Sequence, residues 1–250
     1  MSDWNRFCGL VRRCIDDYGM LSPGDSVAVG VSGGKDSLVL LAALRQLQRY
    51  HPSGFRLQAV TCLLGFEGMD YTPVADWCAA QDIPYTVLDT DIREIVFDLR
   101  QESNPCSLCA KLRKGALMNA ARELGCSKAA LGHHFDDAVE TYMMNLLFEG
   151  RIGCFQPMTL LDRSGITQIR PLLYCGEKST AAMAEQLSLP IVQNTCPLDF
   201  TSKRREVKEL LASMSRDYPD IKDKIFGAMQ RLPLDGWAPH HTNRKGDHHE

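Results

Sequence analysis

A six-residue turn between a predicted strand and a predicted helix constrains the fold of this chain more than any other feature. The turn directly follows the apolar run 27–31, which is typical of a buried strand, and directly precedes a run with helical spacing. Its residues are Ser32, Gly33, Gly34, Lys35, Asp36 and Ser37. Two glycines let the backbone approach an anion, and the free N–H groups at a helix start point toward it. The spacing is neither GxxxxGK[ST] nor GxGxxG, so it indicates a phosphate site of another kind rather than a plain Ser/Gly turn.

Predicted strands alternate with predicted helices along most of the chain. Strands are expected at residues 27–31, 56–64, 85–89, 128–132 and 166–172. Helices are expected at residues 36–50, 73–81, 106–125, 136–148, 180–187, 202–214 and 221–229. This alternation predicts an α/β fold with a doubly wound parallel sheet, in which ligands bind at the carboxyl ends of the strands. The 32–37 turn and Gly132-His133-His134 each follow a strand, so we expect both to open on one crevice.

Three of the ten cysteines suggest a metal site. Cys106 and Cys109 form a CxxC at a predicted helix start, where the helix dipole and basic neighbours are expected to lower the thiol pKa. Cys196 precedes a proline, a pair that recurs in iron–sulfur ligation. Structural zinc is normally bound by four protein ligands, so three cysteines favour a [4Fe–4S] cluster in which one iron is exposed. A redox-active CxxC is the alternative.

Two carboxylates and a histidine pair follow the fourth predicted strand. Asp136 and Asp137 open the next helix, where one carboxylate can serve as a cap and the other can bind Mg²⁺ or act in catalysis. We favour Asp137 for the catalytic role. Gly132 and His133 are expected to line the phosphate side of the crevice, although a histidine here can also be a buried structural side chain.

Composition limits the kinds of partner that the chain can have. It has 250 residues and a net charge of −3, so any RNA contact must come from local basic patches. Apolar runs of 18 or more residues are absent, so no membrane partner is expected. The first six residues lack the apolar core of a signal peptide, which predicts a cytoplasmic location.

Several motifs, in order, resemble one known family. They are SGGKDS at 32–37, PCSLCAKLRKGAL at 105–117, ELG at 123–125, LGHHFDD at 131–137, NLL at 145–147, IRPL at 169–172 and CP at 196–197. SGGKDS matches the PP-loop of the ATP pyrophosphatases. The whole set, over roughly residues 5–235, resembles the tRNA 2-thiocytidine synthetase family of PP-loop enzymes.

The resemblance implies an ATP-dependent tRNA sulfurtransferase that thiolates C2 of a cytidine in the anticodon loop. Adenylation turns the C2 oxygen into a good leaving group, and AMP and pyrophosphate are released. Lys35 is expected to stabilise charge on the α-phosphate, while Asp36 orients the loop or Mg²⁺. The family also implies a [4Fe–4S] cluster on Cys106, Cys109 and Cys196, a cysteine desulfurase or sulfide as the sulfur donor, and a homodimer.

The apolar pattern and the resemblance together predict how the chain is organised. Residues 1–24 are expected to form an N-terminal helical segment, and residues 25–200 are expected to form the PP-loop ATP-binding domain with the cysteine site. Residues 201–235 carry C-terminal helices, and residues 236–250 are expected to be a disordered tail.

Basic residues near these motifs are candidates for tRNA phosphate contacts. They are Arg113, Lys114, Arg170, Lys203, Arg204 and Arg205, and the run of three at 203–205 is favoured. An ordinary solvated face is the alternative for each of them.

Other functions stay open at this point. A PP-loop thiolase can act on another tRNA nucleoside such as 2-thiouridine, or on a small molecule. A PP-loop amidotransferase or lysidine-type ligase uses a nitrogen nucleophile and needs no cluster. A nucleotide-binding or redox-sensing module needs no pyrophosphate release. A persulfide route is an alternative to sulfur held on iron.

Overall fold

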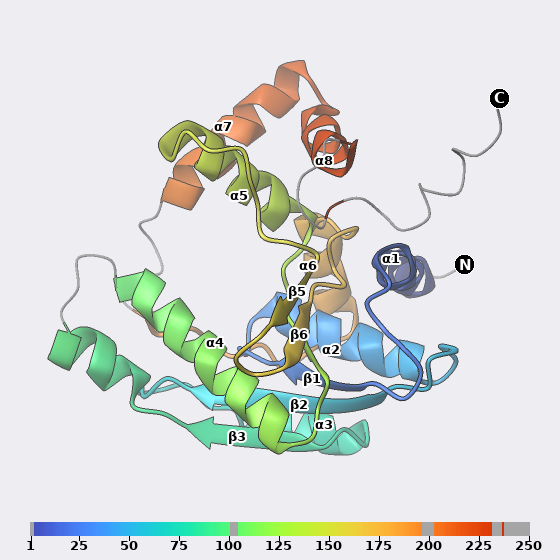
Figure 1. Cartoon of the computed structure of the whole chain (residues 1–250), viewed down its shortest axis with the longest axis vertical. Helices are drawn as coiled ribbons and strands as arrows, with labels where there is room; N and C mark the ends of the chain where they lie inside the picture. Colours follow the sequence, from blue (N-terminus) through green and yellow to red (C-terminus); the bar gives the residue numbers. More distant parts are fainter. Residues whose placement is uncertain (1–2, 101–104, 197–202, 232–236, 238–250) are drawn as a thin grey trace.

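The computed structural model describes residues 3–100, 105–196, 203–231 and 237, and a six-stranded sheet lies at its centre (Figure 1). The strands are β1 (Ser26–Gly30), β2 (Arg56–Leu63), β3 (Tyr85–Asp89), β4 (Lys128–Ala130), β5 (Met158–Leu161) and β6 (Ile166–Ile169). Their order in the sheet is β3-β2-β1-β4-β6-β5, and every neighbouring pair is parallel except β5 with β6. The predicted α/β fold is therefore confirmed, with one antiparallel edge strand added.

Helices follow most of the strands, as the sequence pattern predicts. They are α1 (Asp3–Tyr18), α2 (Lys35–Gln48), α3 (Thr72–Ala80), the π-helix η1 (Glu94–Arg100), α4 (Pro105–Glu123), α5 (Phe135–Phe148), α6 (Glu177–Gln186), α7 (Lys203–Asp217) and α8 (Ile221–Arg231). The end of α4 shows how local sequence sets a boundary. Gly125 takes a φ of +67° and the N–H of Cys126 donates to the Ala121 carbonyl oxygen at 2.8 Å, which closes the helix.

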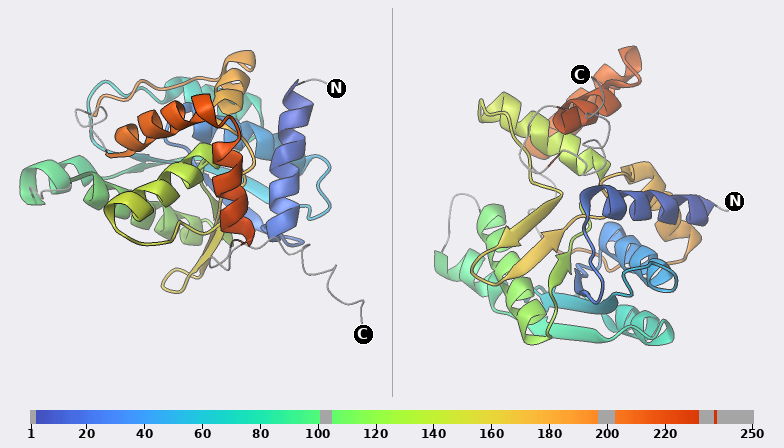
Figure 2. Two further views of the ribbon diagram at one scale, coloured as in Figure 1. Left: turned by 90° about the horizontal axis from the view of Figure 1, so that it is seen from above. Right: turned by 45° about the vertical axis from the view of Figure 1, so that its right-hand side comes forward.

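The sheet is covered on both faces because side chains along β1 alternate in direction. Val27 and Val29 join the core beneath α2, together with side chains of α1, α3 and α6. Ala28 joins a smaller core on the opposite face, where it meets Leu117 and Ala121 of α4. Helices α5, α7 and α8 form a separate group at one end of the molecule, visible at the top of Figure 1 and in the right-hand view of Figure 2.

Two elements escape the sequence prediction. Strand β5 has four residues and pairs with only one neighbour, so its apolar pattern is too short to recognise. The π-helix η1 was not expected either, since no sequence signal distinguishes it from a loop or an α-helix. Strand β6 ends at Ile169, earlier than expected, because Pro171 follows and the Arg170 N–H donates outside the ladder, to Pro157.

Both ends of the described chain pack on the main domain. α1 lies against α2 and buries Phe7, Val11 and Ile15 in the larger core. Trp237 falls within the segment predicted as a tail, but it is buried and its indole N–H donates to the Phe155 carbonyl oxygen at 3.0 Å. Residues 238–250 lie outside the described residues. Within the described ranges, no helix is long and apolar enough to cross a membrane.

Candidate active site

The turn of residues 32–37 is closed by hydrogen bonds of its own serines. Ser37 Oγ donates to the Gly34 carbonyl oxygen at 2.9 Å and accepts from the Ser32 N–H at 3.1 Å. Gly34 is the N-cap residue of α2 and has no side chain to cap the helix. The first N–H groups of α2 are therefore left for an anionic ligand, which is the arrangement a phosphate site needs.

Gly33 is the most constrained residue of the turn. Its φ of +83° lies in the left-handed region, and an added Cβ would come within 2.7 Å of the Val192 Cβ atom. The Val192 N–H donates to the Gly33 carbonyl oxygen at 2.9 Å, and the Tyr71 hydroxyl donates to the Ser32 carbonyl oxygen at 3.0 Å. Two segments distant in sequence thus enclose the turn, and glycine is required on both conformational and steric grounds.

Charged side chains surround the start of α2. Lys35 Nζ lies 3.0 Å from Asp36 Oδ2 and 3.8 Å from Glu177 Oε1, at the beginning of α6. Lys208, from α7, also reaches Glu177, with its Nζ 2.7 Å from Oε2. Lys208 and Lys35 ammonium groups therefore share one carboxylate. Asp36 Oδ1 is buried and has no hydrogen-bond partner among the described residues, so it is an acceptor open to a cation or a donor.

The end of β4 lies directly against the phosphate turn. A Cβ added to Gly132 would meet the Asp36 carbonyl carbon and the Ser37 nitrogen at 3.0 Å, so a larger residue would push the two segments apart. This contact places the first and fourth strand ends side by side, as the sequence predicts.

His133 and His134 have different surroundings. The His133 ring lies 5.0 Å from the Phe155 ring, tilted by 43°, and its Nδ1 is buried without a partner among the described residues. Burial, with nearby Arg170, lowers the pKa of His133 to about 4. It is therefore neutral at physiological pH. The His134 side chain is the N-cap of α5, and its Nε2 lies 3.9 Å from the open oxygen of Asp36.

Asp136 and Asp137 both hold elements in place. Asp137 Oδ2 accepts from the His134 N–H at 2.9 Å in a capping box, and Oδ1 accepts from Arg204 at 3.1 Å. Asp136 accepts from the Glu177 N–H at 2.7 Å and from Lys222 of α8 at 2.6 Å. Burial acts against the ionised form of Asp136, but these hydrogen bonds bring its pKa below the usual value.

Arg204 joins α7 to α5 through two carboxylates. Its guanidinium lies 3.1 Å from Asp137 Oδ1 and 3.2 Å from Glu140 Oε2. Glu140 is 4 % exposed, and burial raises its pKa although Arg204 opposes the shift. Without Arg204, the ionised Glu140 carboxylate would be a buried charge that has lost its ion pair with the guanidinium.

The three predicted cluster ligands come into one electrostatic neighbourhood. Cys106 and Cys109 lie in the first turn of α4, and the charges of Cys106 and Cys196 both act on the Cys109 thiol. Within the described ranges, however, no group of three His, Cys, Asp or Glu side chains is gathered tightly enough to hold a metal ion. The expected lowering of thiol pKa is wrong for Cys109, because burial raises its pKa and Arg113 only opposes this.

A short segment connects the cysteine site with the phosphate site. It begins at Val192, bonded to Gly33, and ends four residues later at Cys196; on the way the Thr195 hydroxyl donates to the Glu67 carbonyl oxygen at 3.0 Å. Four residues span at most about 14 Å. Arg113 also acts electrostatically on both Cys109 and Tyr71, which contacts the phosphate turn. The segment from Val192 to Cys196 therefore keeps the cysteine site close to the phosphate turn.

Comparison with known proteins decides the family. The PP-loop domain matches residues 11–212. The tRNA-cytidine(32) 2-sulfurtransferase of Pelobacter propionicus is 38% identical over 92% of this chain and 86% of its own length. The chain belongs to the PP-loop family of tRNA-cytidine(32) 2-sulfurtransferases.

Further relatives agree with this assignment. The tRNA-cytidine(32) 2-sulfurtransferase of Geobacter sulfurreducens is 37% identical over 90% of this chain and 89% of its own length. Among solved structures, the U34-tRNA thiolase NcsA from Methanococcus maripaludis with its [4Fe-4S] cluster has a TM-score of 0.74 and 27% identity, covering 90% of this chain and 77% of that one. The NH3-dependent NAD synthetase from Campylobacter jejuni, with a TM-score of 0.51 and 15% identity, covers 93% of this chain and 95% of its own and shares the fold.

The basic residues considered for tRNA binding fall into two groups in this family member. Arg113, Lys114, Lys203 and Arg205 are exposed, although Lys203 lies over the Phe148 ring at 4.9 Å and Arg205 pairs with Glu209 at 3.1 Å. Arg204 is engaged by carboxylates on α5. Arg170 is only 6 % exposed and lies over the Phe155 ring at 4.7 Å, so its guanidinium is not presented on the surface.

Several site residues carried no recognisable signal in the sequence. Glu177 and Lys208 come to the phosphate turn from helices far along the chain, and Tyr71 and Val192 enclose it. The motif IRPLLYCGE, which leads into α6 and ends at Glu177, was the nearest available clue. A carboxylate shared by two lysines can be found only once the helices are placed in space.

Proposed function

We propose that this chain is an ATP-dependent tRNA sulfurtransferase that replaces the C2 oxygen of cytidine 32 with sulfur. The observation that carries the proposal is the connection of at most about 14 Å between the Gly33–Val192 hydrogen bond and Cys196. It brings an activating site and a sulfur site into reach of one base. The names of the relatives at 37% and 38% identity support cytidine 32 as the target.

The reaction proceeds in two displacements. The C2 oxygen of the base attacks the α-phosphorus of ATP, the bond to the β-phosphate oxygen breaks, and pyrophosphate leaves. A sulfur nucleophile at the sulfide level then attacks C2, and the carbon–oxygen bond breaks. AMP departs with the original oxygen, so no external oxidant or reductant is needed, and the products are thiolated tRNA, AMP and pyrophosphate.

The phosphate turn supplies the activating site in this proposal. Ser32, Gly33, Gly34 and Ser37 present donors to the ATP phosphates, and Lys35 stabilises the charge that grows on the phosphates as pyrophosphate leaves. Lys208 adds a second ammonium group from α7, because it shares Glu177 with Lys35. The open oxygen of Asp36 is suited to Mg²⁺, which prefers carboxylate ligands.

The end of β4 shapes the other wall of the crevice. Gly132 keeps this strand close to the turn, and neutral His133 faces ATP as an uncharged ring. Asp137 is our candidate catalytic carboxylate: it acts on the base once Arg204 and the capping box hold it in position. Asp136 supports it by tying α6 and α8 to the start of α5.

Cys106, Cys109 and Cys196 are proposed to hold a [4Fe–4S] cluster. Cysteine thiols are the ligands that such clusters take, and the U34-tRNA thiolase NcsA, at 27% identity, carries one. The three side chains would have to come closer together than they do in this structure. When bound, the cluster supplies an iron that has no protein ligand and can hold the sulfur to be transferred. Arg113 lies beside Cys109, where its charge favours the thiolate form.

The exposed basic residues provide the tRNA surface in this proposal, with Lys203 and Arg205 on α7 and Arg113 and Lys114 on α4 flanking the crevice. A cysteine desulfurase or free sulfide as the sulfur donor, a homodimer and a cytoplasmic location stay predictions.

Mass spectrometry of tRNA nucleosides tests the proposal. Cells lacking the gene are expected to lose 2-thiocytidine, and the wild-type gene is expected to restore it while Lys35→Ala is not. Loss of 2-thiouridine instead would move the target to the nucleoside class named for the NcsA neighbour and keep the chemistry. Unchanged thionucleosides would overturn the proposal.

A further inference from the structure

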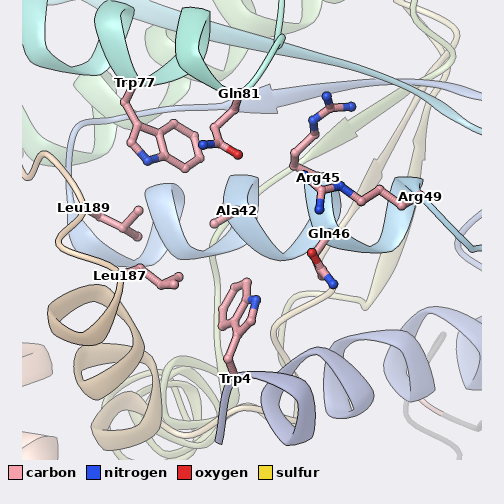
Figure 3. A pocket seen from close by; sticks show the side chains of 9 residues that line it. All are labelled: Trp4, Ala42, Arg45, Gln46, Arg49, Trp77, Gln81, Leu187 and Leu189. Carbon is pink, nitrogen blue, oxygen red and sulfur yellow. The ribbon is translucent and has the colours of Figure 1, made fainter. Parts of the chain in front are cut away.

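A pocket of about 180 Å³ lies on the side of α2 that faces away from the sheet (Figure 3). Its floor is Ala42, seven residues along α2 from Lys35, so it lies about 10 Å or more along the helix from the phosphate turn. Residues of α1, α3 and the end of α6 complete its walls. The proposed thiolation uses none of these residues, so the pocket has no role in the chemistry described above.

Two of the three tryptophans of the chain line this pocket. Figure 3 shows the Trp77 ring of α3 and the Trp4 ring of α1 on opposite sides of Ala42. Both rings are partly exposed. The Trp4 ring also stacks on Phe7, with ring centroids 5.8 Å apart. Indole rings on two sides of a cavity with a small floor residue suit a planar aromatic ring, because stacking on aromatic side chains accepts any base.

Arginines make one end of the pocket positive. Arg45 Nε is buried and has no hydrogen-bond partner among the described residues, although the same guanidinium donates to Gln48 at 2.9 Å. Its other contact is Asp82, at 3.6 Å, whose side chain is 90% exposed and solvated. Arg49 follows one turn later and is exposed. A buried N–H without an acceptor is unfavourable, so an acceptor atom of a ligand gains free energy here.

We propose that this pocket binds a nucleotide, with the base between the two indoles and the phosphate on the arginines. Its volume equals that of roughly six waters, which accommodates a base but not a whole nucleotide. The ribose and phosphate therefore extend along α2 toward Arg45 and Arg49. The nucleotide comes either from a single strand of RNA or from the free pool, and both sources present the same chemistry.

Tryptophan fluorescence tests this directly, since the third tryptophan, Trp237, is buried elsewhere. The full chain carrying Lys35→Ala, which weakens the phosphate turn, is titrated with AMP and separately with a short single-stranded oligocytidine RNA. We expect saturable quenching. Arg45→Gln should weaken binding by about tenfold, because it removes the charged donor, and Trp77→Leu should remove most of the quenching. Arg6→Gln, at an exposed position of α1 outside the pocket, is the matched control and should change nothing.

The two ligands distinguish the two sources. Quenching by AMP alone assigns the pocket to a free nucleotide, and quenching by the RNA alone assigns it to a strand. Quenching that is absent, or that is equal in Arg45→Gln, overturns the proposal. A tryptophan spectrum that changes with protein concentration alone, together with faster sedimentation, would instead show a second copy on this face and also overturns it. Since thiolation is never measured, failure of the proposed function leaves this result intact.

Discussion

The proposed site has two walls, the phosphate turn of residues 32–37 and the helices α5 to α8, and these are held together in different ways. In the phosphate turn, the decisive hydrogen bonds join residues three and five positions apart, through Ser37 to Gly34 and to Ser32. On the opposite wall, the decisive contacts are ion pairs between helices. Lys208 and Glu177 are 31 residues apart, Arg204 and Asp137 are 67 apart, and Lys222 and Asp136 are 86 apart.

The phosphate turn is therefore a rigid wall, and the helices joined by ion pairs are a responsive wall, whose stability changes with salt and pH. The turn keeps its shape through backbone conformation and close packing, which salt and pH hardly affect. The ion pairs join side chains that are between 11% and 50% exposed, so their attraction is partly screened by salt and changes with protonation. The responsive wall joins α5, α6, α7 and α8 to one another.

The largest effect is expected at Gly33, where both the backbone conformation and the close packing of the turn require a glycine. Gly33→Ala forces a side chain into the left-handed region and within 2.7 Å of the Val192 Cβ atom, so ATP binding and thiolation should be lost. Gly24→Ala is the matched control, since Gly24 has a φ of +80° and open space around its Cβ position. It should cost about 1–2 kcal/mol of stability and leave ATP binding unchanged. Isothermal titration with an ATP analogue distinguishes the two, and equal behaviour of both variants would contradict the packing argument.

A second pair of variants separates the two sites chemically. Lys35→Ala should abolish adenylation and leave iron binding intact, because Lys35 touches only the phosphate side. Cys196→Ser should abolish iron binding and thiolation while ATP binding persists. Anaerobic iron analysis and pyrophosphate release measure the two properties independently. A Cys196→Ser protein that retains a complete [4Fe–4S] spectrum would remove Cys196 from the ligand set.

The same contrast explains what could be read from the sequence. The hydrogen bonds inside the turn, the individual strands β1 to β4 and the end of α4 at Gly125 depend on residues close together in the chain, so motif and periodicity predicted them. Glu177, Lys208 and the burial of Arg170 depend on how distant helices pack. Periodicity gives the buried face of a helix but not the neighbour it meets, so Arg170 looked like a surface cation although it is buried against the Phe155 ring. Strand β5 was missed because four residues give too little pattern.

The pH dependence of the responsive wall follows from Glu140. Burial raises its pKa above the ordinary value of 4.5, so its contribution to stability is present below that pH and is lost as the pH rises. Arg204→Ala removes the cation that opposes this shift. We expect a loss of about 1–3 kcal/mol at pH 7.5, below that of a fully buried pair because the Arg204 side chain is 40% exposed, and a smaller loss at pH 5. Urea unfolding at both pH values measures it. Adding Glu140→Gln should recover most of the loss, and equal losses at both pH values would disprove the assignment.

A smaller effect is expected from Lys208, which shares Glu177 with Lys35. Lys208→Ala should raise the Kd for ATP about three- to tenfold, because one half-exposed ammonium group is removed from the phosphate site. Lys224→Ala is the control, since its exposed pair with Asp220 lies at the start of α8. Unchanged ATP affinity in Lys208→Ala would mean that the phosphate site consists of the local turn alone. The helices of the responsive wall would then play no part in binding the phosphates.

The smallest effect on the protein itself is expected from Arg205. Its side chain is 68% exposed and pairs only with Glu209 one turn away, so Arg205→Ala should change stability by less than about 0.5 kcal/mol. If Arg205 contacts a tRNA phosphate, the variant should bind tRNA more weakly, and the slope of log K against log salt should fall by about one. Filter binding at several salt concentrations measures that slope. An unchanged slope would mean that this face of α7 is merely solvated, and that the helix serves the site through Arg204 and Lys208 on its inner side.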